Sequence, residues 1–382
     1  MIPYGRQSIS EADIAAVVDV LRSDFLTQGP AIPKFEQAMC AKVGAQYGVA
    51  VNSATSGLHI ACLALGLGPD DLLWTVPNTF VASANCARYC GADVDFVDID
   101  PVTQNISVTA LAEKLRTAER LPKIVVPVHF SGQPCDMKEI AILARQYGFK
   151  IIEDASHAVG ATYFGEPVGS CQYSDIAIFS FHPVKIITSG EGGLALTNDA
   201  ALAEAMVMLR SHGITRDATR YEQPDRGPWY YEQQMLGYNY RMIDIEAALG
   251  LSQLGRLDAF IARRNQLAAR YDDLLSGLDI QKPKVLPNRL SSFHLYVVRL
   301  TVRDADRHRR VFEKLRADGV GVNVHYTPVH LQPDFQRLGF APGDFPEAER
   351  HGATAISLPM YADLSDEAQL TVVNSLINAL GE

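Results

Sequence analysis

The sequence predicts an α/β fold: helices cover both faces of a mostly parallel seven-stranded sheet, and a smaller α+β domain follows at the C-terminus. Three observations support this fold class. Short apolar segments alternate with amphipathic ones over the first two-thirds of the chain, as in repeated β/α units. The short segments are apolar at consecutive positions, as in IVVPV at 124–128, which is typical of strands buried on both faces. After residue 242 the alternation stops and a long helical stretch begins.

Composition indicates an ordinary globular protein of 382 residues, with 47% hydrophobic and 20% charged residues. This length suits two or three domains. The net charge of −10 argues against nucleic acid or an acidic membrane as partner. No apolar run is long enough to span a membrane, and the first ten residues lack the apolar region of a signal peptide. The six cysteines form no C-x-x-C pair. We expect a cytoplasmic protein without a metal site.

The first predicted element is an amphipathic helix over residues 10–24, in which Ser10 and Asp13 form a capping box. The seven predicted strands are 48–51, 72–76, 94–97, 124–128, 150–153, 176–180 and 194–197. The helices predicted between them are 55–65, 81–89, 137–147 and 200–211. Together these elements form a predicted first domain, residues 1–242, which we expect to hold the functional site.

The predicted second domain, residues 243–382, begins with a helical stretch over 243–275. The elements predicted after it are a strand at 292–302, a helix at 305–317, a strand at 320–324 and a helix at 365–380. The residues of the last helix expected to face the core are Leu370, Val373, Ile377 and Leu380. Before this domain, the polar stretch 216–228 is predicted to be an exposed loop, a kind of segment that often carries function.

Two segments at strand ends predict ligand contacts. Residues 52–57 (NSATSG) follow a strand and open a helix, so their N–H groups and hydroxyls can bind a phosphate at the positive end of the helix dipole. The alternative is a plain helix cap. Residues 151–157 (IIEDASH) form an apolar strand that ends in Asp154, where parallel sheets present side chains to ligands. The alternative is that Asp154 caps a following helix.

A third segment, residues 180–193 (SFHPVKIITSGEGG), carries one lysine, Lys185, among apolar neighbours. Burial lowers the pKa of a lysine and frees the amine as a nucleophile. The alternative is an exposed turn lysine with a buried stem. The three segments together supply a phosphate site, a carboxylate and an activated amine. Pyridoxal 5'-phosphate needs these three groups, so the sequence predicts it as the cofactor.

Signatures of several other enzyme classes are missing from the sequence. There is no Walker phosphate loop, no HExxH and no GxSxG. Residues 66–71 (GLGPDD) begin like a dinucleotide fingerprint, but Asp71 stands where the third glycine belongs, which disfavours a dehydrogenase. His325 and His330 flank Pro328, and such a loop gives a metal pair no fixed geometry. A non-catalytic ligand-binding protein of the same fold stays an alternative.

Over essentially its whole length, the chain resembles the DegT/DnrJ/EryC1/StrS sugar aminotransferases, which are fold type I pyridoxal-phosphate enzymes. The resemblance is most specific at residues 180–185 and 190–193, and residues 52–56 and 154–157 add to it. It implies that Lys185 is catalytic: it would bind the cofactor aldehyde and then carry a proton. Asp154 would pair with the ring nitrogen. The other cofactor contacts implied are Ala54, Thr55 and Ser180 at the phosphate, Phe80 against the ring face, His157 at the ring hydroxyl, and Asn239 at the phosphate of the neighbouring subunit in a homodimer with shared sites.

The same resemblance implies a nucleotide-sugar substrate and L-glutamate as amino donor. Residues 28–29, 127–134, 237–241 and 324–326 are similar to members that aminate C4 of a UDP-linked 4-keto-6-deoxy-2-acetamido-hexose. The substrate contacts implied are Tyr4, Asp24, Phe25, Leu26, Thr27, Ser53, Asn323, Val324, His325 and Tyr326.

Arg241 is a separate candidate for the diphosphate, because an acidic protein must place a cation there locally. An ordinary salt bridge is the alternative for this arginine. Two alternatives concern the reaction. The first is transfer to another nucleotide-linked 4-keto sugar. The second is a dehydratase of the same family, which would carry histidine at the position of Lys185; the lysine disfavours this reading.

Overall fold

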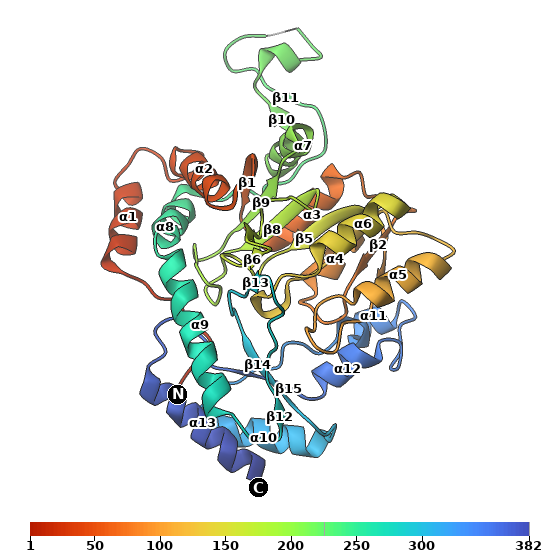
Figure 1. Ribbon diagram of the computed structural model, residues 1–382. Helices are drawn as coiled ribbons and strands as arrows, with labels where there is room; N and C mark the ends of the chain where they lie inside the picture. Colours follow the sequence, from red (N-terminus) through yellow and green to blue (C-terminus); the bar gives the residue numbers. More distant parts are fainter. Residues whose placement is uncertain (225, 382) are drawn as a thin grey trace.

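A computed structural model describes residues 1–224 and 226–381 of the chain. Asp225, in the predicted loop, and Glu382, at the end of the predicted second domain, lie outside the described residues. The centre of the molecule is a seven-stranded sheet in the order β1-β9-β8-β5-β4-β2-β3 (Figure 1). Its strands are β1 (Tyr47–Val51), β2 (Leu72–Thr75), β3 (Asp93–Phe96), β4 (Ile124–Val126), β5 (Lys150–Asp154), β8 (Ile176–Ser180) and β9 (Gly193–Thr197).

The sheet is mostly parallel, as predicted. β9 pairs antiparallel with β8 and β1, and the pairs β2–β3, β2–β4, β4–β5 and β5–β8 are parallel. The seven predicted strands are the seven strands of this sheet. Because β5 and β8 run parallel, with Asp154 opposite Ile178, their carboxyl ends bring Asp154 and Ser180 to the same edge.

Helices cover both faces of the sheet (Figure 1). Those of the first two-thirds of the chain are α1 (Glu11–Leu21), α2 (Ala31–Val43), α3 (Ala54–Ala64), α4 (Ala82–Tyr89), α5 (Val108–Thr117), α6 (Met137–Tyr147) and α7 (Ala200–Arg210), and then come α8 (Asp244–Leu254) and α9 (Leu257–Leu274). One apolar cluster packs on both faces of the sheet around β2, β4 and β5, and a second fills the face under α2 and α9 at β1, β8 and β9. Alternate residues of β8 divide between them: Ile176 and Ile178 face α3 and α4, whereas Ala177 and Phe179 face α2 and α9. This alternation is what burial on both faces requires.

The C-terminal elements form smaller sheets and helices around a third apolar cluster. The sheet β12-β14-β15 is antiparallel, and β13 pairs with the hairpin β6-β7. The strands are β6 (Thr162–Tyr163), β7 (Glu166–Pro167), β12 (Ile280–Gln281), β13 (Arg289–Leu290), β14 (Tyr296–Leu300) and β15 (Ala355–Leu358). The helices are α10 (Ala305–Ala317), α11 (Pro333–Gln336), α12 (Pro346–Gly352) and α13 (Asp366–Gly381). Short 3-10 turns lie at Phe130–Gly132, Ala218–Arg220 and Val329–Leu331.

A two-stranded arm projects from the sheet domain between α7 and α8 (Figure 1). Its strands are β10 (Ile214–Thr215) and β11 (Glu232–Gln233), which pair antiparallel. The predicted polar loop 216–228 lies between them, and its described residues are mostly exposed. Trp229 and Leu236, on the same arm, are 73% and 76% exposed. Such large apolar side chains on a projecting segment are typical of a surface that meets a partner.

Several predicted elements differ from those observed. Helices α2, α5, α11 and α12 are absent from the prediction. The predicted helix over 243–275 is two helices, because the chain turns at Gly255, whose N–H bonds Ser252 O at 3.2 Å. Residues 320–324 were predicted as a strand, and that prediction is wrong. The segment makes isolated bridges instead, Ile2 with Val320 and Asn323 with Ser357, because the N-terminus lies alongside it: Gly321 N–H bonds Ile2 O at 2.7 Å.

Candidate active site

A cavity of about 460 Å³ lies at the carboxyl ends of β5 and β8. Its walls also include the N-terminus of α3, the turn before α4, the N-terminal segment at Tyr4, the segment after β8, and residues 323–326 near β15. Open α/β sheets bind ligands at this edge. The cavity collects 13 of the predicted site residues: Tyr4, Ser53, Ala54, Thr55, Phe80, Asp154, His157, Ser180, Lys185, Asn323, Val324, His325 and Tyr326.

The start of α3 offers unused hydrogen-bond donors to the cavity. Ser53 is the N-cap of the helix, and its hydroxyl accepts from Ser56 N–H at 3.1 Å. Among the described residues, no atom accepts from the N–H groups of Ala54 and Thr55 or from the Thr55 hydroxyl. Both interpretations of this segment therefore hold: it carries a helix cap, and the groups next to the cap are free to bind an anion.

The backbone of β9 packs closely against the start of α3. An added Cβ on Gly193 of β9 would lie 2.5 Å from Ala54 N, so β9 touches the first turn of α3 at this point. The Ser180 hydroxyl, at the end of the neighbouring strand, also has no bonding partner among the described residues. Free N–H groups, two free hydroxyls and a helix N-terminus form a cradle that fits a phosphate group.

Asp154 ends β5 with its side chain in the cavity wall and is 5% exposed. Its Oδ2 accepts from the Ser83 hydroxyl at 2.6 Å, and its Oδ1 accepts from Ser156 N–H at 3.1 Å. No helix starts after it, so the alternative that Asp154 is a helix cap is wrong. A buried carboxylate that accepts two hydrogen bonds is held in a fixed orientation, which suits a partner for a protonated ring nitrogen.

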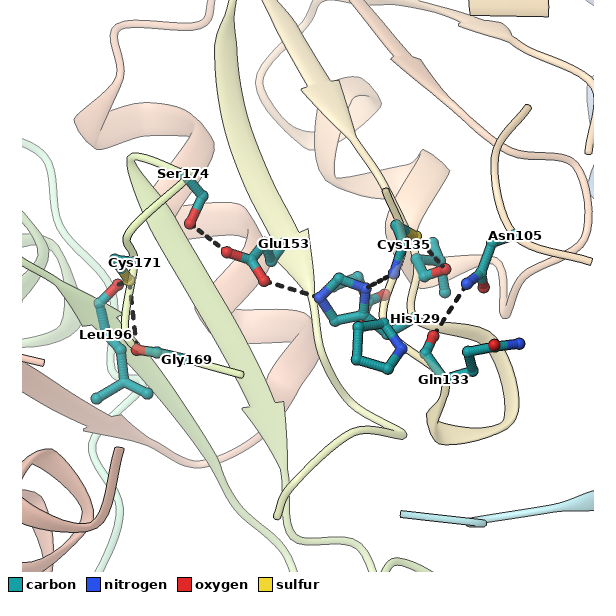
Figure 2. A network of polar contacts seen from close by, with 12 residues as sticks. Asn105, His129, Gln133, Cys135, Glu153, Gly169, Cys171, Ser174 and Leu196 are labelled. Atoms are coloured by element: carbon teal, nitrogen blue, oxygen red, sulfur yellow. Dashed lines mark hydrogen bonds and ion pairs between the residues drawn. The ribbon is translucent and has the colours of Figure 1, made fainter. Parts of the chain in front are cut away.

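The preceding residue, Glu153, points to the opposite face of the sheet, where a second polar network holds β5 (Figure 2). Its carboxylate accepts from Ser174 and lies 2.7 Å from His129 Nε2. His129 Nδ1 accepts from Cys135 N–H at 3.1 Å, so Nε2 carries the proton and donates to Glu153. His129 N–H also bonds Asp154 O. The end of β5 is therefore fixed from both faces.

Lys185 is half-buried in the cavity, after the end of β8. Burial lowers the pKa of its amine to about 8, although the nearby Asp154 carboxylate acts to raise it. Its flanking residues Ile186 and Ile187 are buried. The alternative of an exposed turn lysine is therefore wrong, and the amine is partly neutral near physiological pH, as a nucleophile requires.

Imidazole and phenol groups from two parts of the fold form the opposite wall. Tyr326 Oη lies 3.1 Å from His157 Nε2, and their rings are stacked 6.2 Å apart. His294 lies 4.3 Å from the His157 ring. Burial lowers the pKa of His157 and of His294, and it lowers that of His325 to about 4. These rings are neutral at pH 7, so they offer uncharged donors and acceptors.

Several residues of this site were not predicted from the sequence. Thr79, His182, Glu191 and His294 line the cavity, and Ser83 bonds Asp154 from α4. Thr79 and Ser83 follow β2 with the same small and polar character as residues 52–57, a signal that could have pointed to them. His294 lies outside any recognisable motif, and the fold alone brings it to His157.

Six predicted site residues do not line the cavity of the described chain. Residues 24–27 lie beside α8, where Asp244 N–H bonds Leu26 O at 3.0 Å; Phe25 and Leu26 are exposed. Asn239 and Arg241 lie at the base of the arm, bridged to Ser211 and Val51. The role predicted for Asn239 is on the neighbouring subunit, so a place outside its own cavity is expected. The roles of Asp24, Phe25, Leu26, Thr27 and Arg241 stay predictions.

Two features are absent from residues 1–224 and 226–381. No group of three or more His, Cys, Asp or Glu side chains there could hold a metal ion. His325 and His330 are engaged elsewhere, with Ser357 and Glu349. No helix in this part of the chain is both long and apolar enough to cross a membrane.

Comparison with known proteins gives one consistent result. The spore coat polysaccharide biosynthesis protein SpsC of Bacillus subtilis is 38% identical over 371 residues, covering 96% of this chain and 94% of SpsC. The protein Spr1654 of Streptococcus pneumoniae, solved in a PLP-form, has a TM-score of 0.91 and 29% identity, covering 100% of this chain and 98% of its own. Helicobacter pylori PseC, an aminotransferase involved in the biosynthesis of pseudoaminic acid, has a TM-score of 0.91 and 29% identity, covering 100% and 99%.

The family comparison agrees with the site. The sequence profile of the DegT/DnrJ/EryC1/StrS aminotransferase family matches residues 7–377, which include the phosphate cradle, Asp154 and Lys185. These residues also supply the three groups that the cofactor chemistry needs. The chain belongs to the DegT/DnrJ/EryC1/StrS aminotransferase family.

Proposed function

We propose that this sugar aminotransferase moves an amino group from L-glutamate to C4 of a UDP-linked 4-keto-6-deoxy-2-acetamido-hexose. The product would be UDP-4-amino-4,6-dideoxy-N-acetyl-β-L-altrosamine. The cofactor is pyridoxal 5'-phosphate, which the family member Spr1654 holds in its PLP-form. The observation that carries the proposal is that Lys185, Asp154 and the free donors of α3 share one cavity.

The residues present fit the cofactor group by group. The N–H groups of Ala54 and Thr55, with the hydroxyls of Thr55 and Ser180, would hold its phosphate. Asp154 would face its ring nitrogen, and His157, a neutral ring beside Tyr326, would lie at the ring hydroxyl. Phe80, 59% exposed at the cavity mouth, would cover a ring face once the cofactor is bound.

When bound, the cofactor supplies an aldehyde that takes up the amino group and a ring that accepts electrons. Lys185 would transfer the protons in this reaction. Its amine, with a pKa lowered to about 8 by burial, would bond the aldehyde and afterwards carry a proton to and from the reacting carbon. Asp154 would pair with the ring nitrogen and favour its protonated form. The same lysine serves both half-reactions, so we expect ping-pong kinetics.

The sugar assignment is supported by the segments that resemble members acting on this substrate, and by the likeness to PseC. The cavity wall also suits a sugar, because its neutral groups can bond hydroxyl and acetamido groups without a charge. Asn323, His325 and Tyr326 from the C-terminal domain would make these contacts, with Tyr4 beside the His325 ring at 5.6 Å. Arg241 remains our candidate for the diphosphate; its buried Nε has no partner among the described residues.

We also propose a homodimer with shared sites, located in the cytoplasm. The exposed arm and the place of Asn239 at its base support the dimer. All six cysteines are free, which suits a reducing compartment.

The test of the proposed function uses Lys185. Sodium borohydride makes the bond between a lysine and a bound aldehyde permanent, so peptide mapping of the treated holoenzyme should find the cofactor on Lys185. The Lys185→Ala variant should lose the visible cofactor absorbance and at least about 10⁴-fold of turnover, because it removes the nucleophile. Lys150→Ala is the matched control, since that lysine is exposed and pairs with Asp175.

The substrate is tested in the same preparation with glutamate and UDP-4-keto sugars of both C5 configurations, followed by identification of each aminated product. Amination at C4 of the sugar named above supports the proposal. Amination of a different 4-keto sugar alone replaces the substrate assignment but keeps the aminotransferase. Label on another lysine, or unchanged turnover in Lys185→Ala, contradicts the proposed function.

A further inference from the structure

Two buried hydroxyl groups form a relay that ends on Asp154. The Thr79 and Ser83 hydroxyl oxygens lie 2.8 Å apart, and the Ser83 hydroxyl donates to Asp154 Oδ2 at 2.6 Å. Thr79 is 2% exposed and Ser83 is fully buried. Water cannot replace either hydroxyl without a rearrangement of the turn before α4.

The number of protons on each group determines which oxygen donates in each of these two hydrogen bonds. A hydroxyl has a single proton to donate, and an ionised carboxylate can only accept. Ser83 gives its proton to Asp154, so Thr79 must be the donor to Ser83. Both O–H groups therefore point toward Asp154, the arrangement that favours the charged form of a buried carboxyl group.

The fold adds to this effect. Ser83 lies in the first turn of α4, which begins at Ala82, and the N-terminus of a helix carries partial positive charge. Thr79 and Phe80, in the turn before it, line the cavity. On the other oxygen, Ser156 N–H holds Oδ1. The carboxylate is thus held at both oxygens, so its plane and its charge are set before any ligand binds.

We propose that Ser83, oriented by Thr79, is a positioning residue that holds the Asp154 carboxylate in place and aimed at the cofactor ring. The inference rests on the proposed function, because it concerns the group assigned to the ring nitrogen. Ser83 is absent from the residues that line the cavity. It acts through Asp154, and its loss should change the electronic state of the bound cofactor.

Ser83→Ala tests the inference in the holoenzyme. Without the donor, Asp154 Oδ2 loses a hydrogen bond that fixes the orientation of the carboxylate toward the ring nitrogen, so we expect the ring nitrogen to hold its proton less firmly. We expect the pH midpoint of the visible cofactor absorbance to move by about half a unit or more, since a lost hydrogen bond to a charged group alters protonation free energies by that order. We also expect kcat to fall about tenfold, with the KM for the nucleotide sugar unchanged.

Three variants separate positioning from packing. Thr79→Val keeps the shape of the side chain but removes its hydroxyl, so it should shift the midpoint in the same direction as Ser83→Ala, by less. Thr79→Ser keeps the hydroxyl and should restore the wild-type midpoint. Ser174→Ala is the matched control, because Ser174 donates to Glu153 on the opposite face of the same strand (Figure 2); its midpoint should equal the wild-type value.

The outcomes distinguish this inference from the proposed function. A wild-type midpoint in Ser83→Ala, in protein that binds the cofactor through Lys185, overturns the positioning role alone. An equal shift in Ser174→Ala also overturns it, because the effect would then be a general loosening of β5. If the wild-type protein shows no cofactor bound to Lys185, the proposed function falls and this inference falls with it.

Discussion

At the scale of single residues, the proposed role of Lys185 makes its protonation control how the enzyme takes up its cofactor. The amine must be neutral to attack an aldehyde, and burial lowers its pKa to about 8 while Asp154 opposes that change. An exposed lysine, with its pKa near 10.4, would be almost entirely charged at pH 7. The cavity therefore makes one particular lysine reactive through its surroundings.

This protonation predicts a pH dependence. The rate at which cofactor-free enzyme captures pyridoxal phosphate should rise roughly tenfold per pH unit below about 8 and level off above it, as the neutral fraction saturates. In Asp154→Asn the inflection should move to lower pH, because the charge that raises the lysine pKa is gone. Stopped-flow absorbance between pH 6 and about 9.5 measures both. An inflection near the pKa of a free lysine would contradict the assigned environment.

At the scale of elements, α1 is fastened to α8 by a single buried carboxylate. Asp13 is fully buried; it accepts from Ser252 at 2.6 Å and Gln253 at 2.8 Å, and it forms an ion pair with Arg256. Burial acts to raise the pKa of Asp13, but the hydrogen bonds from Ser252 and Ser10 and the charge of Arg256 outweigh it and lower that pKa.

Asp13→Ala should lower the free energy of unfolding by about 2 kcal/mol, because it removes the buried acceptor of Ser252, Gln253 and Arg256, although the last two keep a hydrogen bond to Ser8 O. Since the folded-state pKa is lowered, the contribution is complete above the unfolded-state pKa of about 3.9 and is lost as pH falls through the folded value. Urea unfolding at neutral and acidic pH should show the difference in unfolding free energy between wild type and Asp13→Ala shrinking as the pH falls.

Asp258→Ala is the control. It removes an exposed pair with Lys42 and should change the unfolding free energy by less than about 1 kcal/mol. Equal losses in the two variants would contradict this account.

The final helix shows how an element can be predicted in place but wrongly oriented. α13 was expected to bury Leu370, Val373, Ile377 and Leu380, yet Leu370 and Ile377 are about 40% exposed. The buried face is turned by one position and includes Val372, Val373, Leu376 and Ala379. The polar Gln369 is on that face because its side chain bonds Leu267 O at 2.7 Å. The periodicity of apolar residues along a helix carries no information about such a long-range hydrogen bond.

At the scale of the whole molecule, the proposed dimer predicts complementation between defective subunits. If Asn239 serves the partner's cofactor, a mixture of Lys185→Ala and Asn239→Ala subunits contains hybrids with one intact site. After dissociation and reassociation, activity should recover to about a quarter of the wild-type value, from statistical mixing of subunits in a symmetric dimer. Steady-state turnover before and after mixing measures it. No recovery in mixtures that mass spectrometry shows to contain hybrids would place Asn239 outside a shared site.

The sequence by itself determined the seven strands of the central sheet, most of the longer helices, and the segments that carry Asp154 and Lys185. Strands, their burial on both faces and the helix at Ala54 follow from local patterns, since apolar periodicity and caps act over a few residues. Asp154 and Lys185 were found for the same reason: each lies in a short segment whose neighbours reveal its surroundings.

Only the tertiary structure decided which distant residues meet. Ser83 on Asp154, Tyr326 on His157, His294 in the cavity wall and the N-terminus beside residues 320–324 depend on how separate elements pack. The same holds for the exposed or buried side of α13. Packing sums many weak contacts over the whole chain, so no short window of sequence contains the information that fixes these pairs.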